Sequence, residues 1–343
     1  MAHIITCYNC RVKISETGEF GLIERLRTLI EADKAVSGPH LILGAGDDAA
    51  AWRSDAAVNL ATVDCLIQDI HFKIEKISWR ELGWKALAVS LSDIAAMGGV
   101  PKYALFSLAF PEETDIEDIA ELYKGILELA GRFDVKIIGG NISRAPLVFI
   151  DSIVYGIASK PDIMLTRSAA RPGEEIAVTG YLGAAAGGLR IIENNMSLAD
   201  CINNPLLKAF NTPLPRIREG QKLAAEGIKC AMDISDGLAA DLGHICEASR
   251  VSAIINIDNV PVHPAIKKAF GNDALDMAIS GGEDYELLFT AGHDIMESIK
   301  KQLDCPLTVI GKIVAGDEHR VSLSDNAGKA YTPSAKGWNH FGK

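Results

Sequence analysis

Carboxylates in four short acidic segments are the residues of this chain best suited to chemistry. The segments are GAGDDAA (44–50), TVDCLIQDIHF (62–72), LSDIAAMGG (91–99) and MDISDGLAADLGH (232–244). In the first, Asp47 and Asp48 are adjacent and have no Lys or Arg within four residues, so their mutual repulsion calls for a counter-charge. Magnesium takes oxygen ligands and is commonly held by a few carboxylates together with substrate phosphates. The four segments therefore predict a divalent-cation site that carries nucleotide phosphates.

Each aspartate taken alone is weaker evidence for a metal site than the aspartates of the four segments taken together. An aspartate at the start of a helix usually caps free N–H groups, and this applies to Asp236 taken alone. The aspartates of suitable type and position are Asp48, Asp64, Asp93, Asp233 and Asp236.

Glycine-rich turns are the second class of candidate. TGYLGAAAGGL (179–189) follows an expected strand and opens an expected helix, so its amides would suit a phosphate, although a glycine packing turn is an equal alternative. No G-x₄-G-K-[ST] pattern occurs, so an ATP-using enzyme of this sequence would rely more on metal ions. Glu283 and Asp284 in ISGGEDYELLF (279–289) fit either a ligand-binding turn or a solvated acidic loop.

The spacing of apolar residues predicts both α-helices and β-strands, and these elements are expected to position the acidic and glycine-rich segments. A turn-rich, charged stretch, SKPDIMLTRSAARPGEE (159–175), indicates a domain boundary near 160. The predicted organisation is an N-terminal extension (1–12), a first domain (13–160) and a second domain (161–343). Helices are expected over 19–36, 79–97, 115–132, 184–193, 213–226 and 236–249, and strands over 57–64, 102–109, 135–139, 147–158, 174–180, 230–235, 251–257, 285–290 and 306–313.

Composition narrows the class of protein. With 343 residues, 48% hydrophobic and 23% charged, the chain suits two globular domains. A net charge of -11 argues against binding nucleic acid or an anionic membrane. No apolar run reaches the roughly 18 residues of a membrane helix, and MAHIITCYNCRVK lacks a signal-peptide pattern, so we expect a cytoplasmic protein. The seven scattered cysteines predict no disulfide framework, and the lone Cys7/Cys10 pair lacks the further ligands of a zinc site.

Taken in order, these segments resemble the thiamine-monophosphate kinase family, a branch of the aminoimidazole-ribonucleotide synthetase superfamily. The similarity runs from ISETGEFGLIERL (14–26) to KGWNHF (336–341) and is most specific in LSDIAAMGG, TRSAARPGEEIAVTGYLG, MDISDGLAADLGHI and SGGEDYELLFT. The resemblance implies an α/β fold of the α+β type, with an N-terminal mixed-sheet domain for ATP, metal and dimerisation and a C-terminal α/β domain. It also implies Mg²⁺-assisted, in-line phosphoryl transfer from ATP to thiamine monophosphate within a homodimer.

The same resemblance implies roles for individual residues. Asp48, Asp64, Asp93, Asp233 and Asp236 match metal ligands, with Thr62 and Val63 at neighbouring metal positions, and Asp48 and Asp236 are the expected catalytic pair. Arg167, Ser235, Gly140 and Asn141 match nucleotide-site positions, and His71, Glu283 and Trp338 match substrate-binding positions.

Asn141 departs from the family pattern. It stands where the family usually carries an aspartate that ligates metal, so one negative charge is missing. We expect weaker metal binding at one site, or a different metal count.

Four alternatives remain beside this interpretation. An aminoimidazole-ribonucleotide synthetase would share the fold and the use of ATP. A selenophosphate synthetase needs a reactive cysteine in an N-terminal glycine-rich loop, and Cys7 and Cys10 lie in none. A hydrogenase-maturation dehydratase carries a C-terminal cysteine tail, whereas this chain ends in HFGK. A catalytically silent nucleotide-binding homologue is suggested by Asn141 alone.

Overall fold

The N-terminal half of the chain forms a six-stranded sheet in the order β1-β2-β3-β6-β4-β5. This computed structural model describes residues 41–43, 47–54, 58–158, 163–316, 320–335 and 337–338. Neighbouring strands are antiparallel except β4 and β5, whose parallel pairing is allowed by the crossover helix between them. The strands are β1 (Leu41–Leu43), β2 (Ala50–Arg53), β3 (Val58–Ile67), β4 (Val100–Phe110), β5 (Lys136–Arg144) and β6 (Phe149–Ala158).

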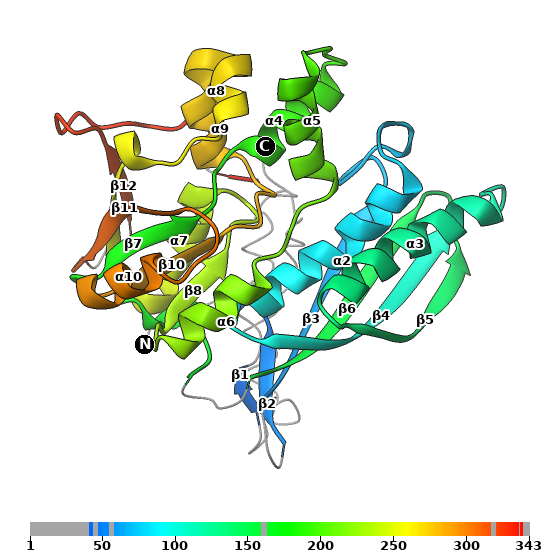
Figure 1. Ribbon diagram of the computed structural model, residues 1–343, viewed down its shortest axis with the longest axis horizontal. Helices are drawn as coiled ribbons and strands as arrows, with labels where there is room; N and C mark the ends of the chain where they lie inside the picture. The colour runs from blue at the N-terminus through cyan, green and yellow to red at the C-terminus, as the bar shows by residue number, and fades with distance from the viewer. Residues whose placement is uncertain are drawn as a thin grey trace, which may run out of the picture.

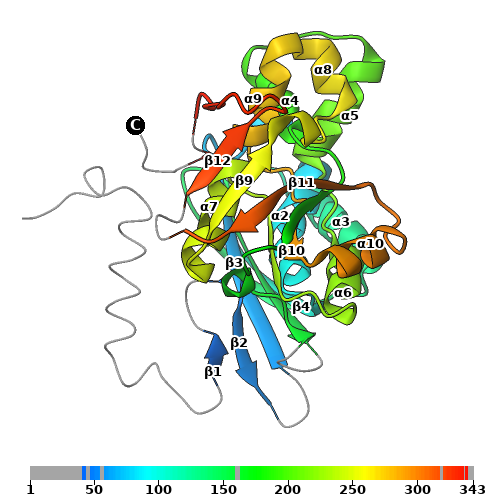
Figure 2. The same ribbon diagram turned by 90° about the vertical axis from the view of Figure 1, so that its left-hand side faces the viewer.

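The C-terminal half forms a second six-stranded sheet in the order β12-β9-β11-β7-β10-β8. Only β12 and β9 pair in parallel within this sheet. Figure 2 shows its strands β9, β11 and β12 above strands β1, β2 and β3 of the first sheet. The strands are β7 (Glu175–Thr179), β8 (Cys230–Asp233), β9 (Ser252–Asn256), β10 (Leu287–Ala291), β11 (Leu307–Val314) and β12 (Val321–Ser324).

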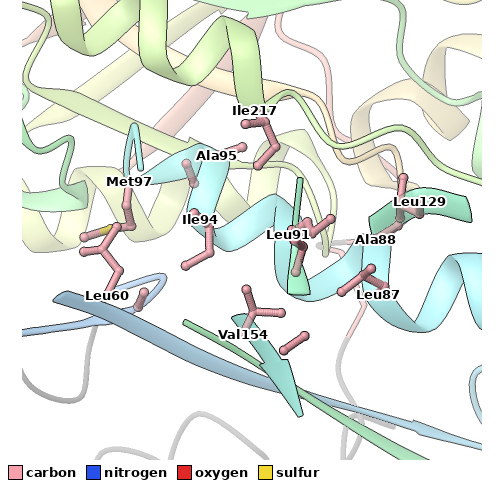
Figure 3. Packing of buried hydrophobic residues seen from close by; sticks show 14 of the residues in the cluster. Leu60, Leu87, Ala88, Leu91, Ile94, Ala95, Met97, Leu129, Val154 and Ile217 are labelled. Carbon is pink, nitrogen blue, oxygen red and sulfur yellow. The ribbon is translucent and has the colours of Figure 1, made fainter. Parts of the chain in front are cut away.

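Helix α2 (Trp79–Ala96) belongs to the core of both halves. It begins at a capping box formed by Ser78 and Glu81 and is buried over most of its circumference, as expected for a helix that is packed on all sides. Figure 3 shows its Leu91 and Ile94 between the first sheet and the helix α6 that carries Ile217. One hydrophobic cluster runs from the first sheet through α2 into the second half.

Helix α3 (Ile116–Arg132) covers the first sheet beside α2 (Figure 1). Two glycines permit the close approach of these helices. A Cβ at Gly83 would lie 1.8 Å from the carbonyl oxygen of Leu122, and a Cβ at Gly125 would lie 1.8 Å from that of Arg80. The backbones therefore touch, and α2 is held in a fixed place on the sheet.

The remaining helices surround the second sheet. Figure 1 shows α4, α5, α8 and α9 grouped at one end of the molecule. Among the helices that the structure describes, none is long and apolar enough to cross a bilayer. The helices are α4 (Ala184–Glu193), α5 (Asp200–Asn211), α6 (Ile217–Ala225), α7 (Leu238–Ser249), α8 (Pro264–Phe270), α9 (Ala274–Ser280) and α10 (His293–Lys300).

The expected fold class is confirmed, since each half combines a mixed sheet with helices. Most predicted elements occur within a few residues of their expected ends, although β5 continues through the glycine pair to Arg144. The helix expected over 213–226 begins only at Ile217, because a proline at 215 holds the preceding residue extended. The prediction lacked β1, β2, β12, α5, α8, α9 and α10. The helix expected over 19–36 and the Cys7/Cys10 pair lie outside the described residues, and the boundary near 160 stays a prediction.

Candidate functional site

Three aspartates from distant parts of the sequence meet at the junction of the two halves. Asp48 lies just before β2, Asp93 lies near the end of α2, and Asp233 ends β8. One carboxylate oxygen of each lies within 4.8 Å of the others. Three like charges this close repel one another strongly unless a cation or protons neutralise them.

Hydroxyl groups orient these carboxylates and connect a fourth. Ser92 Oγ donates a 2.6 Å hydrogen bond to Asp233, and the Thr62 hydroxyl donates to Asp93. Ser90 Oγ donates to Asp64 at 2.8 Å, so the β3 carboxylate joins the same network. We call Asp48, Asp64, Asp93 and Asp233 the acidic cluster.

Burial makes three members of the acidic cluster, Asp64, Asp93 and Asp233, hold protons more tightly than ordinary carboxyls. It raises the pKa of Asp233 to about 7, and the charge of Asp48 adds to this rise. It also raises the pKa of Asp93 well above its usual value, helped by Asp64 and Asp233. The pKa of Asp64 moves in the same direction through burial. A bound cation would replace these protons, because it stabilises the ionised form.

Asp48 has features of a metal ligand. Its Oδ2 is buried and has no hydrogen-bond partner among the described residues, although its Oδ1 pairs with the guanidinium of Arg167. The Arg167 backbone N–H also donates to Asp47 at 3.3 Å. Burial, followed by the charge of Asp48, raises the pKa of Asp47 to about 7. A buried carboxylate oxygen without a donor suits a hard cation.

Asp236 belongs to a second group. Its carboxylate lies with Asp241 and His244, whose ligand atoms all fall within 4.8 Å of one another. Asp241 is buried, and one of its oxygens accepts the backbone N–H groups of residues 235, 236 and 237 at 3.1, 3.2 and 3.0 Å. Asp241, which no sequence pattern singled out, therefore fixes the loop that contains Ser235 and Asp236.

The predicted phosphate cradle at the start of α4 is occupied by a side chain. Asp284 accepts the N–H of Gly183 at 2.6 Å and that of Ala185 at 3.2 Å. The glycine-rich turn over 179–189 therefore packs against the protein's own carboxylate. Burial raises the pKa of Asp284 to about 7, so a solvated acidic loop was also a wrong interpretation of this segment.

Glu283 and Trp338 approach the loop that follows β8. The Glu283 N–H donates to the Ser235 carbonyl at 2.8 Å, and the Trp338 N–H donates to the Asp236 carbonyl at 2.9 Å. Two of the predicted substrate-binding residues thus lie beside Asp236. The third, His71, follows β3, where its Nδ1 accepts the Ile67 N–H at 3.0 Å.

Gly140 and Asn141 are not brought to the acidic cluster within one copy of the chain. Both are exposed on edge strand β5, and β4 and β6 separate them from β3. The register places Gly140 in line with Asp64 across three strand spacings, or roughly 14 Å. The Asn141 side chain donates to Ser143 at 3.3 Å.

The sequence analysis also missed Lys85. This α2 residue is completely buried and pairs with Glu283. Its spacing of one heptad from Ser92 places both on the same face of α2, but no local pattern identifies the partner 198 positions away.

Comparisons with known proteins agree with this architecture. The family model described as AIR synthase related protein, N-terminal domain, matches residues 46–158, and that of the C-terminal domain matches residues 171–324. The thiamine-monophosphate kinase of Bacillus subtilis strain 168 is 35% identical over 330 residues, which cover 94% of this chain and 99% of that protein. The enzyme of the same name from Escherichia coli K12 is 36% identical over 334 residues, with 94% and 98% covered. The structure described as AaThiL complexed with AMPPCP and TMP matches with a TM-score of 0.82 and 29% identity, covering 97% of this chain and 99% of that one.

Proposed function

Since this chain belongs to the thiamine-monophosphate kinase family of AIR synthase related proteins, we propose that it uses ATP to phosphorylate thiamine monophosphate to thiamine diphosphate. The observation that carries the proposal is the convergence of the acidic cluster at the junction of the two halves. The similarity to a complex with AMPPCP and TMP over nearly the whole chain supports the choice of substrates.

The chemistry of this reaction suits a site built from charge and position. The attacking group is a phosphate oxygen that is mostly ionised at neutral pH, so no strong general base is required. The barrier lies in aligning two anions and in neutralising their charge. The role of the protein is therefore to orient both phosphates and to exclude water.

We propose Mg²⁺ as the ion that the acidic cluster holds. Two buried carboxylates, Asp48 and Asp233, and the half-buried Asp64 and Asp93 provide hard oxygen ligands, which fit this ion. The Asp48 Oδ2 has no hydrogen-bond partner among the described residues. When bound, Mg²⁺ supplies positive charge to the phosphates. Asp236 would contribute from its neighbouring group, with Asp241 fixing its loop, and Thr62 and Val63 would contribute backbone oxygens from β3.

The protein's own groups would orient the two substrates. Arg167 has a buried Nε that lacks a hydrogen-bond partner among the described residues, so its guanidinium has capacity for a nucleotide phosphate. Ser235 would contact the nucleotide from the loop that Asp241 organises. His71, Glu283 and Trp338 would contact thiamine monophosphate.

A homodimer would complete the site. One face of the first sheet packs on α2, but Val63 and Tyr103 are exposed on the other face, and β5 presents exposed Ile138 and Ile142 at an open edge. We propose that a second copy covers this surface, which would let Gly140 and Asn141 act in the partner's site. We also propose the cytoplasm as the location of the reaction, in keeping with its two phosphorylated substrates.

The experiment that tests the function is a measurement of magnesium-dependent ADP formation. Purified protein would receive thiamine monophosphate, free thiamine or formylglycinamidine ribonucleotide in separate reactions. We expect ADP only with thiamine monophosphate, together with thiamine diphosphate as product. Turnover with the ribonucleotide alone would assign a sister activity of the superfamily, and silence with all three would indicate a homologue without catalysis.

A further inference from the structure

Lys85 is a buried cation enclosed by two side chains. Its side chain is 0% exposed, and its Nζ lies 3.1 Å from Oε1 and 3.1 Å from Oε2 of Glu283. The same Nζ lies 3.5 Å from the ring centroid of Phe210, which belongs to α5. Burial lowers the pKa of Lys85, and the charge of Glu283 opposes that change. The Lys85 ammonium therefore interacts with one carboxylate, through hydrogen bonds and charge, and with the face of one aromatic ring.

Glu283 is held in an uncommon backbone conformation. Its φ is +65°, in the left-handed region that residues other than glycine seldom adopt. The preceding glycine allows the close approach, because a Cβ at Gly282 would lie 2.3 Å from the carbonyl oxygen of Ser235. The Glu283 side chain is still 24% exposed, so it keeps an accessible part while Lys85 holds the carboxylate. Such outliers cluster at ligand-binding sites.

The position of Lys85 along α2 indicates which part of a substrate Glu283 meets. Lys85 and Ser92 are seven residues apart on one face of the helix, and Ser92 binds Asp233 of the acidic cluster. Seven residues correspond to about 10 Å along a helix axis. A molecule whose phosphate lies at the acidic cluster would therefore meet Glu283 at its far, heterocyclic end.

We propose that Lys85 is a positioning residue for substrate recognition, which fixes the Glu283 carboxylate against the heterocyclic end of thiamine monophosphate. This inference rests on the proposed function and adds a determinant of substrate affinity to it. Lys85 acts through Glu283, because its enclosed ammonium has no surface left for a ligand. The lysine is thereby separated from the phosphates, which a lysine in a nucleotide site would ordinarily contact.

The test compares KM values in a double-mutant cycle. Wild type, Lys85→Met, Glu283→Gln and the double variant are assayed for KM of thiamine monophosphate, KM of ATP and kcat. We expect Lys85→Met to raise KM of thiamine monophosphate roughly tenfold, the order of one lost charge-assisted hydrogen bond, and to leave KM of ATP within about twofold. The double variant should be no worse than Glu283→Gln alone, since one removes the orienting group and the other the group it orients.

Two further variants keep the test decisive. Lys124→Met removes an exposed lysine of α3 and should change neither KM. If Lys85→Met fails to fold, Phe210→Leu keeps the ion pair and removes the ring, and it should raise KM of thiamine monophosphate alone, by a smaller factor.

Equal rises in both KM values, or additive effects in the cycle, would overturn the role of Lys85 while wild-type turnover preserved the function. A wild type without turnover of thiamine monophosphate would overturn both.

Discussion

Two groups of buried acids lie at the junction of the halves, and they differ in how their charge is balanced. In the segment over 283–286, Glu283 pairs with Lys85, Asp284 accepts amides of α4, and Glu286 is bound by Arg216 and by Thr179. In the acidic cluster, Asp48 pairs with Arg167, and no other member has a cationic partner among the described residues. The other three carboxylates accept hydrogen bonds from hydroxyl groups. We infer that carboxylates whose charge is compensated by protein cations or amides stabilise the fold. Carboxylates without such compensation are suited to binding a cation.

The largest expected effect is the loss of activity on neutralising one carboxylate of the acidic cluster. Asp93→Asn should lower kcat by roughly 10²–10³-fold, the range seen when one electrostatic contact to a transition state is removed. The melting temperature should stay the same or rise, because burial and then the neighbouring charges already disfavour the ionised form of Asp93. Steady-state kinetics and thermal unfolding measure the two effects. Turnover near that of wild type would remove Asp93 from the site, and Glu117→Gln at an exposed position in the first turn of α3 is the control.

Neutralising one carboxylate of the segment over 283–286 should lower the stability of the protein and leave its activity nearly unchanged. Glu286→Gln removes the nearer carboxylate of the largely buried Arg216 and leaves only Glu219, 3.9 Å away. Breaking a buried pair in this way costs about 3 kcal/mol of unfolding free energy. Activity per folded molecule should change little. Urea denaturation followed by kinetics on the folded fraction would check both. Unchanged stability together with lost activity would mean that the two groups of acids do not divide their roles in this way.

The dependence of stability on pH should also distinguish the acidic cluster from the segment over 283–286. The pKa of Asp233 and that of Asp284 are raised to about 7 from an ordinary 3.8, so the folded state binds more protons than the unfolded state between these values. Metal-free protein should therefore lose stability as the pH rises from about 4 to about 7. Magnesium should restore the part that belongs to the acidic cluster and leave the part that belongs to Asp284.

Melting temperatures with EDTA and with Mg²⁺ would measure this contrast. In Asp233→Asn the portion restored by magnesium should shrink, and in Asp284→Asn the portion insensitive to magnesium should shrink. A magnesium effect that is identical in wild type and Asp233→Asn would count against a metal at that carboxylate.

The smallest expected effect concerns the edge strand. Asn141→Asp restores a negative charge on β5, and in a dimer this should lower the magnesium concentration for half-maximal rate several-fold. Titration of activity with MgCl₂ measures it, and Ser143→Asp on the same strand is the control for added charge. An unchanged magnesium dependence would mean that β5 of the partner does not reach the cluster.

Much of the fold and of the candidate site is encoded in local patterns. The β-branched, apolar stretch over 147–158 predicted β6, and the helical spacing of Leu82, Ala86, Val89 and Ile94 predicted α2, both closely. The acidic segments predicted a shared site for five aspartates, and Asp48, Asp93 and Asp233 do meet, whereas Asp236 lies in a second group. Their assignment as metal ligands stays a prediction.

What the sequence could not predict depends on pairings between distant residues. The bond from Lys85 to Glu283 spans 198 positions, and the occupation of the α4 amides by Asp284 spans 101. The separation of Asn141 from the cluster follows from strand order, which places β6 and β4 between β5 and β3. Short elements such as α8 and β12 give too few residues for a periodic signal.

The shared position of α2 also constrains how the molecule moves. A kinase whose halves were joined by a linker could open its cleft as a hinge, but here the cluster of buried apolar residues continues from Leu60 of the first sheet through Ile94 of α2 to Ile217 of α6. Separating the halves would expose that core to water, so a single cooperative transition in calorimetry is expected in place of two. We therefore expect substrates to enter and products to leave without separation of the two halves.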